Sequence, residues 1–221
     1  MKNNREIVEF FAIPVIKFNF EKHQEYVNKW ENWDKCARQP DGWSCEVNTS
    51  FPDVDENDPF VDMDVVNELK NDLLFAIKKT LRSYTLDADI VFHAFWYNAY
   101  YTQQGQEKHH HLADHNNNPI WSGVYFAKNC HSGQFAFHKN DFSLRTQGYF
   151  DVTNSPLRRY YEDVTPTKFA DGDIVLFPPH LHHAVKVDEK NRDEQRLTFS
   201  FNIDSVAAMN FRREHLKPGE V

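Results

Sequence analysis

Two groups of histidines are the residues in this sequence best suited to chemistry. The first is the run KHHHLADH (residues 108–115), and the second is the run PPHLHH (residues 178–183). Side chains two residues apart on a strand point to the same face, so His109 and His111 are expected to point together. His183, from a neighbouring strand, would complete a set of three metal ligands on one face. Three facial ligands leave open positions for substrate and oxygen, as in non-haem iron oxygenases.

An arginine follows the second histidine group at the start of an alternating segment, QRLTFSFNI (residues 195–203). Apolar residues occupy every second position from Leu197, and polar residues alternate with them from Arg196. Such a strand lies either at a half-solvated surface or beside a polar cavity. In a cavity, the Arg196 guanidinium and the Thr198 hydroxyl would bind a carboxylate through charge-assisted hydrogen bonds.

The elements that position these residues are mostly strands, with helices before them. Apolar residues at helical spacing predict a helix over residues 62–84, capped by Asp62 or Asp64. Short β-branched or aromatic runs predict strands at residues 90–101, 120–127, 134–138, 173–177, 184–187 and 196–203. The expected fold class is mostly β with bracing α-helices, an antiparallel barrel or sandwich.

The remaining segments carry weaker signals. Residues 7–20 are expected to form a strand, residues 21–37 a short helix and residues 38–60 a loop. Residues 140–168 have the composition of an insertion loop that covers a pocket mouth. We expect one domain over residues 1–221, with an N-terminal strand and bracing helices (1–88), a β core (89–204) and a C-terminal tail (205–221).

Composition excludes several classes of protein. The 25 basic and 33 acidic residues give a net charge of −8, which argues against binding to a nucleic-acid backbone. No apolar run approaches the length of a membrane span. The three cysteines are odd in number and lack CxxC spacing, so a reducing cytoplasm is the expected compartment. The sequence leaves the oligomeric state open, a homodimer included.

Residues 95–202 resemble the 2-oxoglutarate/Fe(II)-dependent oxygenases, and in particular a prolyl-hydroxylase-like branch. The similar stretches are FWYNAYY, the histidine pair, WSGVYFAKN with SGQFAFH, GDIVLFPPHLHHAV and QRLTFSFN, in the order that the family requires. The resemblance implies a double-stranded β-helix (jelly-roll) core. It also implies that His109 is the first iron ligand and His183 the distal one.

The same resemblance assigns a co-substrate pocket. Arg196 with Thr198 would hold the distal carboxylate of 2-oxoglutarate, and Tyr97, Asn98 and Tyr125 would lie on strands that line the pocket. The family's first motif is His-x-Asp or His-x-Glu, and this run has neither triplet. His111 is therefore the preferred third ligand, and Asp114 from the following loop is the alternative.

The implied activity is hydroxylation of a C–H bond with Fe(II), 2-oxoglutarate and dioxygen, releasing succinate. A peptidyl or free amino acid, or another small molecule, is the expected substrate, and proline as the target rests on analogy of fold alone. Two alternatives stay open: a cupin-like metalloprotein that does not use 2-oxoglutarate, and a non-catalytic jelly-roll binding module. A cupin has no need of Arg196 as a carboxylate clamp.

Overall fold

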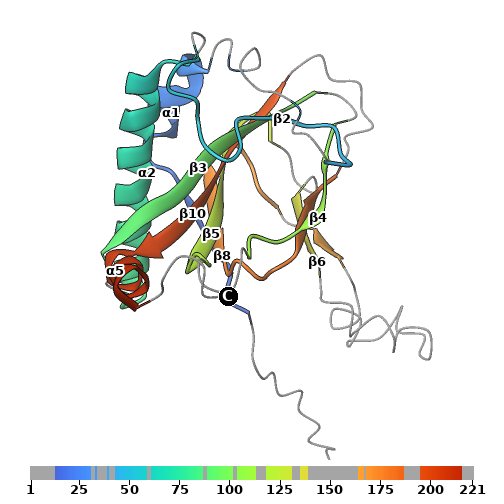
Figure 1. The fold of residues 1–221 in the computed structure, drawn as a ribbon. Coiled ribbons are helices and arrows are strands. Elements are labelled where there is room, and N and C mark those ends of the chain that lie inside the picture. Colours follow the sequence, from blue (N-terminus) through green and yellow to red (C-terminus); the bar gives the residue numbers. More distant parts are fainter. Residues whose placement is uncertain are drawn as a thin grey trace, which may run out of the picture.

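Two antiparallel β-sheets and a long helix form the fold in the computed structural model (Figure 1). The structure describes residues 13–30, 33, 39, 43–58, 61–86, 89–101, 104–112, 118–130, 135–138, 164–166, 168–186 and 195–215. The larger sheet has the strand order β1-β8-β5-β10-β3-β2, and the smaller sheet has the order β4-β9-β6-β7. The predicted fold class is confirmed.

The strands of the larger sheet are β1 (Ile16–Asn19), β2 (Asn48–Thr49), β3 (Ile90–Tyr100), β5 (Trp121–Lys128), β8 (Asp173–Phe177) and β10 (Arg196–Ser205). Those of the smaller sheet are β4 (Gln106–His109), β6 (Phe135–His138), β7 (Val164–Pro166) and β9 (His183–Val185). The helices are α1 (His23–Tyr26), the 3₁₀ helix η1 (Val27–Lys29), α2 (Met63–Ser83) and α5 (Val206–His215). No helix among the described ranges is both long and apolar enough to cross a membrane.

Helix α2 lies along the outer face of the larger sheet (Figure 1). The Asp62 carboxylate accepts hydrogen bonds from the backbone N–H groups of Asp64 and Val65, which caps the first turn. The helix buries a stripe at i, i+3, i+4 spacing against the sheet: Val66, Leu69, Leu73, Ile77 and Leu81. The helix predicted over residues 62–84 is confirmed.

Strand β10 separates the helix-side core from the space between the sheets. It pairs with β3 on one side and β5 on the other, so both of its backbone edges are bonded. Its apolar residues, from Leu197 to Ile203, join the core under α2, and its polar residues point to the other face. Gly123 of β5 pairs with Phe201 of β10, and this position requires glycine because a Cβ there would come within 2.3 Å of the Phe201 ring.

Several predicted boundaries differ from the structure. In the range predicted as a helix, residues 21–37, the structure describes α1, which no side chain caps, and η1, which ends at Lys29. Of residues 31–37 it describes Trp33 alone, in a 3₁₀ turn, so the rest of that prediction lies outside the described residues. The predicted loop 38–60 contains β2, and the predicted tail 205–221 contains α5. The insertion 140–168 contributes β7, while most of that segment, like residues 7–12, lies outside the described residues.

Candidate metal centre and co-substrate pocket

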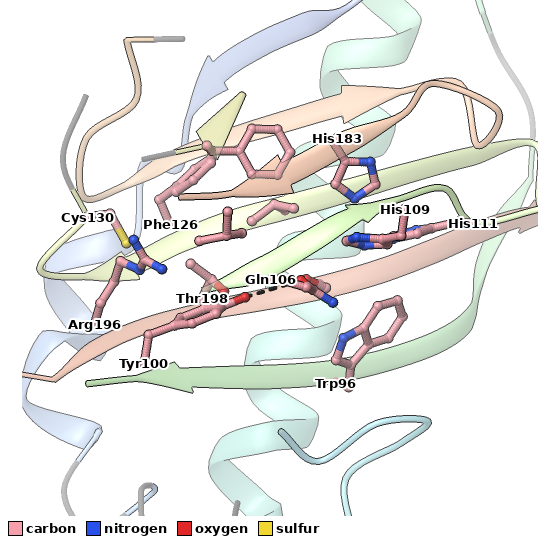
Figure 2. A pocket seen from close by; sticks show the side chains of 14 residues that line it. Trp96, Tyr100, Gln106, His109, His111, Phe126, Cys130, His183, Arg196 and Thr198 are labelled. Atoms are coloured by element: carbon pink, nitrogen blue, oxygen red, sulfur yellow. Dashed lines mark hydrogen bonds between the residues drawn. The ribbon is translucent and has the colours of Figure 1, made fainter. Parts of the chain in front are cut away.

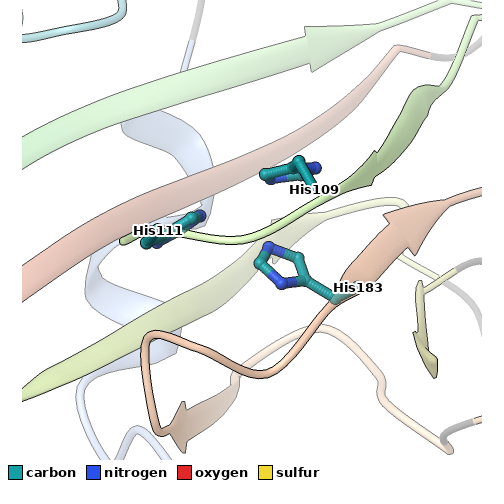
Figure 3. A group of neighbouring side chains, drawn as sticks. All are labelled: His109, His111 and His183. Atoms are coloured by element: carbon teal, nitrogen blue, oxygen red, sulfur yellow. The ribbon is translucent and has the colours of Figure 1, made fainter. Parts of the chain in front are cut away.

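His109, His111 and His183 meet at the edge of the smaller sheet (Figure 3). His109 is the last residue of β4, and it pairs directly with His183, the first residue of β9. His111 follows just beyond β4, where its backbone N–H donates to the carbonyl of Pro179 at 2.9 Å and keeps the chain beside the turn that leads into β9. One ligand nitrogen from each of the three rings lies within 4.8 Å of the others.

The hydrogen bonds of the three rings leave one nitrogen of each free to bind a metal. The His109 Nδ1 lies 2.8 Å from the carbonyl oxygen of Glu107, and the His183 Nδ1 lies 3.0 Å from that of Leu181. Since a carbonyl oxygen only accepts, each Nδ1 carries the proton and donates, and Nε2 keeps its lone pair. The His111 Nδ1 makes the equivalent contact with Oδ1 of Asn202 at 2.9 Å. Metal-binding histidines are oriented in this way in proteins.

Burial keeps the three imidazoles neutral near pH 7, the form that binds metal. Desolvation lowers the pKa of His183 well below its ordinary value, and that of His111 to about 4. Desolvation also lowers the pKa of His109. The described donor set of three neutral imidazoles therefore fits a divalent transition metal such as Fe(II).

The metal-free protein is expected to lose stability as the pH falls below the ordinary histidine pKa of 6.5. In this range the unfolded chain takes up protons that the folded centre does not, down to about pH 4 for His111, so stability rises with pH. The slope should reach up to about 1.4 kcal/mol per pH unit for each histidine. Urea unfolding of chelator-treated protein between pH 7 and pH 5 measures it.

His23 contributes to the same slope, because burial lowers its pKa as well. The unchanged protein is therefore compared with His183→Gln. In this variant the free energy of unfolding should change less steeply with pH, because one of the contributing histidines is gone. A free energy of unfolding that is flat from pH 7 to pH 5 would contradict the expectation.

Asn202 positions His111 from the larger sheet. Its Oδ1 accepts from the His111 ring and from the Ser122 hydroxyl at 2.8 Å. Asn202→Ala should lower the affinity of the centre for Fe(II) about 10- to 100-fold, the usual effect of removing the partner of a ligand histidine. Anaerobic calorimetric titration measures it. Ser122→Ala removes the other contact of the same amide but keeps the hydrogen bond from His111 to Asn202, so it should lower the affinity less than Asn202→Ala does. Equal effects of the two variants would contradict a positioning role.

A pocket between the two sheets runs from the histidines to Arg196 (Figure 2). Arg196 and Cys130 lie at one end, and the three histidines lie at the other. Between them, Thr198 and Ser200 of β10 face Gln106 of β4, and the other lining side chains are mostly aromatic or aliphatic. The pocket thus joins a metal-binding end to a cationic end.

The guanidinium of Arg196 fits a carboxylate ligand. Its side chain is 7% exposed and stacks on the Tyr100 ring, with Cζ 4.2 Å from the ring centroid. Its Nε and Nη2 have no hydrogen-bond partner among the described residues. Buried donors of this kind are normally satisfied, and a carboxylate binding to both would satisfy them together with the Thr198 hydroxyl.

The structure separates the other predicted co-substrate residues. Asn98 lies on the pocket face of β3, where its amide donates to the Ser200 hydroxyl at 3.0 Å. Tyr97 and Tyr125 lie on the opposite face, in the core beside Phe199, so they do not line this pocket. The reason is strand alternation: Tyr97 pairs with Phe199, and Asn98 with Thr198. Asp114, the alternative ligand, lies outside the described residues.

Sequence reasoning missed Tyr100 and Gln106. Tyr100 pairs with Arg196 in register and shares its face, and its hydroxyl donates to Oε1 of Gln106 at 3.3 Å. The two-residue period of β3 could have found Tyr100, since it lies two positions beyond Asn98. Nothing in the sequence marked Gln106, which reaches the pocket because β4 has an irregular register between Gln106 and His109.

Comparisons with other proteins agree with this architecture. Residues 94–202 match the family described as "Putative 2OG-Fe(II) oxygenase". A search of curated proteins found no match.

Among solved structures, HygX from Streptomyces hygroscopicus with nickel, 2-oxoglutarate and hygromycin B bound is similar, with a TM-score of 0.56 and 11% identity over 88% of this chain and 84% of that one. A Trichoplax adhaerens prolyl hydroxylase, in complex with a hypoxia inducible factor peptide fragment, gives a TM-score of 0.55 and 10% identity over 92% and 87%. A Pseudomonas putida prolyl-4-hydroxylase gives a TM-score of 0.52 and 11% identity over 88% of this chain and 94% of that one. At these identities the likeness concerns the fold.

Proposed function

Because residues 94–202 match the 2OG-Fe(II) oxygenase family and the fold is that of these enzymes, we propose that this chain is an Fe(II)- and 2-oxoglutarate-dependent hydroxylase. One observation carries the proposal most directly. Three imidazoles, that of His183 buried and the other two half-buried, each commit Nδ1 to an oxygen and leave Nε2 free. They lie at one end of a pocket whose other end holds a buried arginine with Nε and Nη2 unpaired among the described residues.

His109, His111 and His183 would hold the metal, and Arg196 would hold the distal carboxylate of 2-oxoglutarate. When bound, Fe(II) and 2-oxoglutarate supply the oxidising chemistry, in which dioxygen is consumed, a C–H bond is hydroxylated and succinate is released. The protein positions these groups and excludes water from them. The Glu107 and Leu181 carbonyls and Asn202 fix the imidazoles, while Tyr100 fixes the plane of the guanidinium.

Anaerobic titration of the full chain with Fe(II) and then 2-oxoglutarate tests the proposal. We expect binding of both, with a weak visible charge-transfer band that forms only when both are present. Admission of oxygen should then yield succinate. Absence of the band and of succinate, in a protein that still binds metal, would favour the cupin-like alternative; absence of metal binding would favour the non-catalytic module.

The finer assignments are part of the same proposal. A peptidyl or free amino acid is the substrate class that we infer. The free thiols of Cys45 and Cys130 suit a reducing compartment such as the cytoplasm. One domain over residues 1–221 and a homodimer remain predictions.

A further inference from the structure

A second opening reaches the same histidines from outside the pocket. It is a groove of about 410 Å³, and it shares Trp96, Gln106, His109 and His111 with the pocket between the sheets. The remaining walls come from the segment around β2, from β4 and the residues after it, and from Asn202 of β10. The histidines therefore separate two spaces, and a molecule in the groove would face the metal centre from the side away from Arg196.

The groove is walled by three aromatic rings in contact. The centroid of Trp96 lies 5.5 Å from that of His111 and 5.2 Å from that of Phe51, and Phe51 lies 5.7 Å from Trp43. Trp96 is buried, Trp43 is half-buried and Phe51 is 45% exposed. Such a row suits a hydrocarbon chain, and the faces of the rings also attract a cation.

The charge of the groove favours a cation too. Glu107 contributes a carboxylate at its rim, which accepts hydrogen bonds from the Cys45 thiol and the Ser44 hydroxyl. Among the described residues that line the groove, none is a lysine or an arginine. The net charge of −8 adds long-range attraction for positively charged molecules.

We propose that this groove binds the substrate, and that the substrate is a peptide or amino acid whose side chain is a hydrocarbon ending in a cation, as in lysine. The hydroxylation step in this proposal rests on the proposed function, whereas the binding of the substrate in the groove does not. The methylene groups pack on Trp96 and Phe51 beside the metal centre, and the ammonium group lies among Trp43, Phe51 and Glu107. The hydroxylated carbon is then a methylene of that chain.

Binding is tested on the metal-free full chain, so that the result does not depend on iron or 2-oxoglutarate. The probes are three capped tripeptides, Gly-Lys-Gly, Gly-norleucine-Gly and Gly-Glu-Gly, titrated by tryptophan fluorescence. The lysine peptide should bind about fivefold more tightly than the norleucine peptide, the sum expected of one exposed cation–π contact and one exposed ion pair. The glutamate peptide should bind more weakly than both.

Glu107→Gln should reduce the preference for lysine over norleucine to about twofold or less, and added salt should reduce it in the unchanged protein. Glu68→Gln removes another exposed carboxylate, on helix α2, which does not line the groove, and should keep the full preference. Equal binding of the lysine and norleucine peptides, or an undiminished preference in Glu107→Gln, would overturn the proposal. Lysine-selective binding without succinate formation would refute the hydroxylase and leave the groove assignment intact.

Discussion

Replacing His183 with alanine should abolish tight Fe(II) binding and succinate formation. His183 is 2% exposed, pairs with His109 across β4 and β9, and supplies one of only three described nitrogen ligands. Removing the partner of a ligand histidine already costs 10- to 100-fold in affinity, so loss of the ligand itself should cost at least about 100-fold. Anaerobic titration with Fe(II) and a succinate assay measure the two effects.

Two further variants make this result specific. His180→Ala removes an exposed histidine three residues away and should change neither quantity. His183→Gln keeps most of the side-chain volume, so it separates loss of the ligand from a cavity in the core. Wild-type metal affinity in a folded His183→Gln protein would rule out the three-histidine centre.

Replacing Arg196 with alanine should weaken 2-oxoglutarate binding about 100-fold while leaving Fe(II) affinity unchanged. The guanidinium is buried at the far end of the pocket from the histidines, and its Nε and Nη2 have no other hydrogen-bond partner in the described part of the chain. Two hydrogen bonds to a charged group are together worth about 3 kcal/mol, which corresponds to this factor. Calorimetric titration of the metal-loaded protein with 2-oxoglutarate measures it.

The affinity of Arg196→Lys for 2-oxoglutarate should lie between that of the unchanged protein and that of Arg196→Ala. Lysine keeps the charge but loses the planar pair of donors that stacks on Tyr100. Arg213→Ala removes an exposed arginine of α5 and is the matched control. If Arg196→Ala bound 2-oxoglutarate normally and kept full activity, the chain would be better described as a cupin-like metalloprotein.

The site could be predicted from the sequence where polar and apolar residues alternate. The alternation of β10 placed Arg196 and Thr198 on one face, and the spacing of His109 and His111 placed them together. The structure brings these residues and His183 to a single pocket. The family resemblance, which rested on their order along the chain, is confirmed by the match over residues 94–202.

Prediction failed where both faces of a strand are buried. Residues Phe95 to Tyr100 of β3 are all buried, and most are aromatic, so hydrophobicity could not say which side faces the pocket. Tyr97 was therefore placed in the pocket and Tyr100 overlooked. The contacts that hold the ligand rings were also out of reach, because backbone carbonyls carry no sequence signal and Asn202 is 91 residues from His111.

The alternation of β10 has a consequence for how this protein can change. Odd-numbered positions from Leu197 to Ile203 hold the core together, while even-numbered positions from Arg196 to Asn202 carry the anion clamp and the support of a metal ligand. Substitutions on the even positions can alter ligand preference without touching the core under α2. Insertion or deletion of one residue within the strand would exchange the two sets, placing Phe199 and Phe201 in the polar cavity. New specificity in this strand is thus reached most directly by point substitution at the even positions.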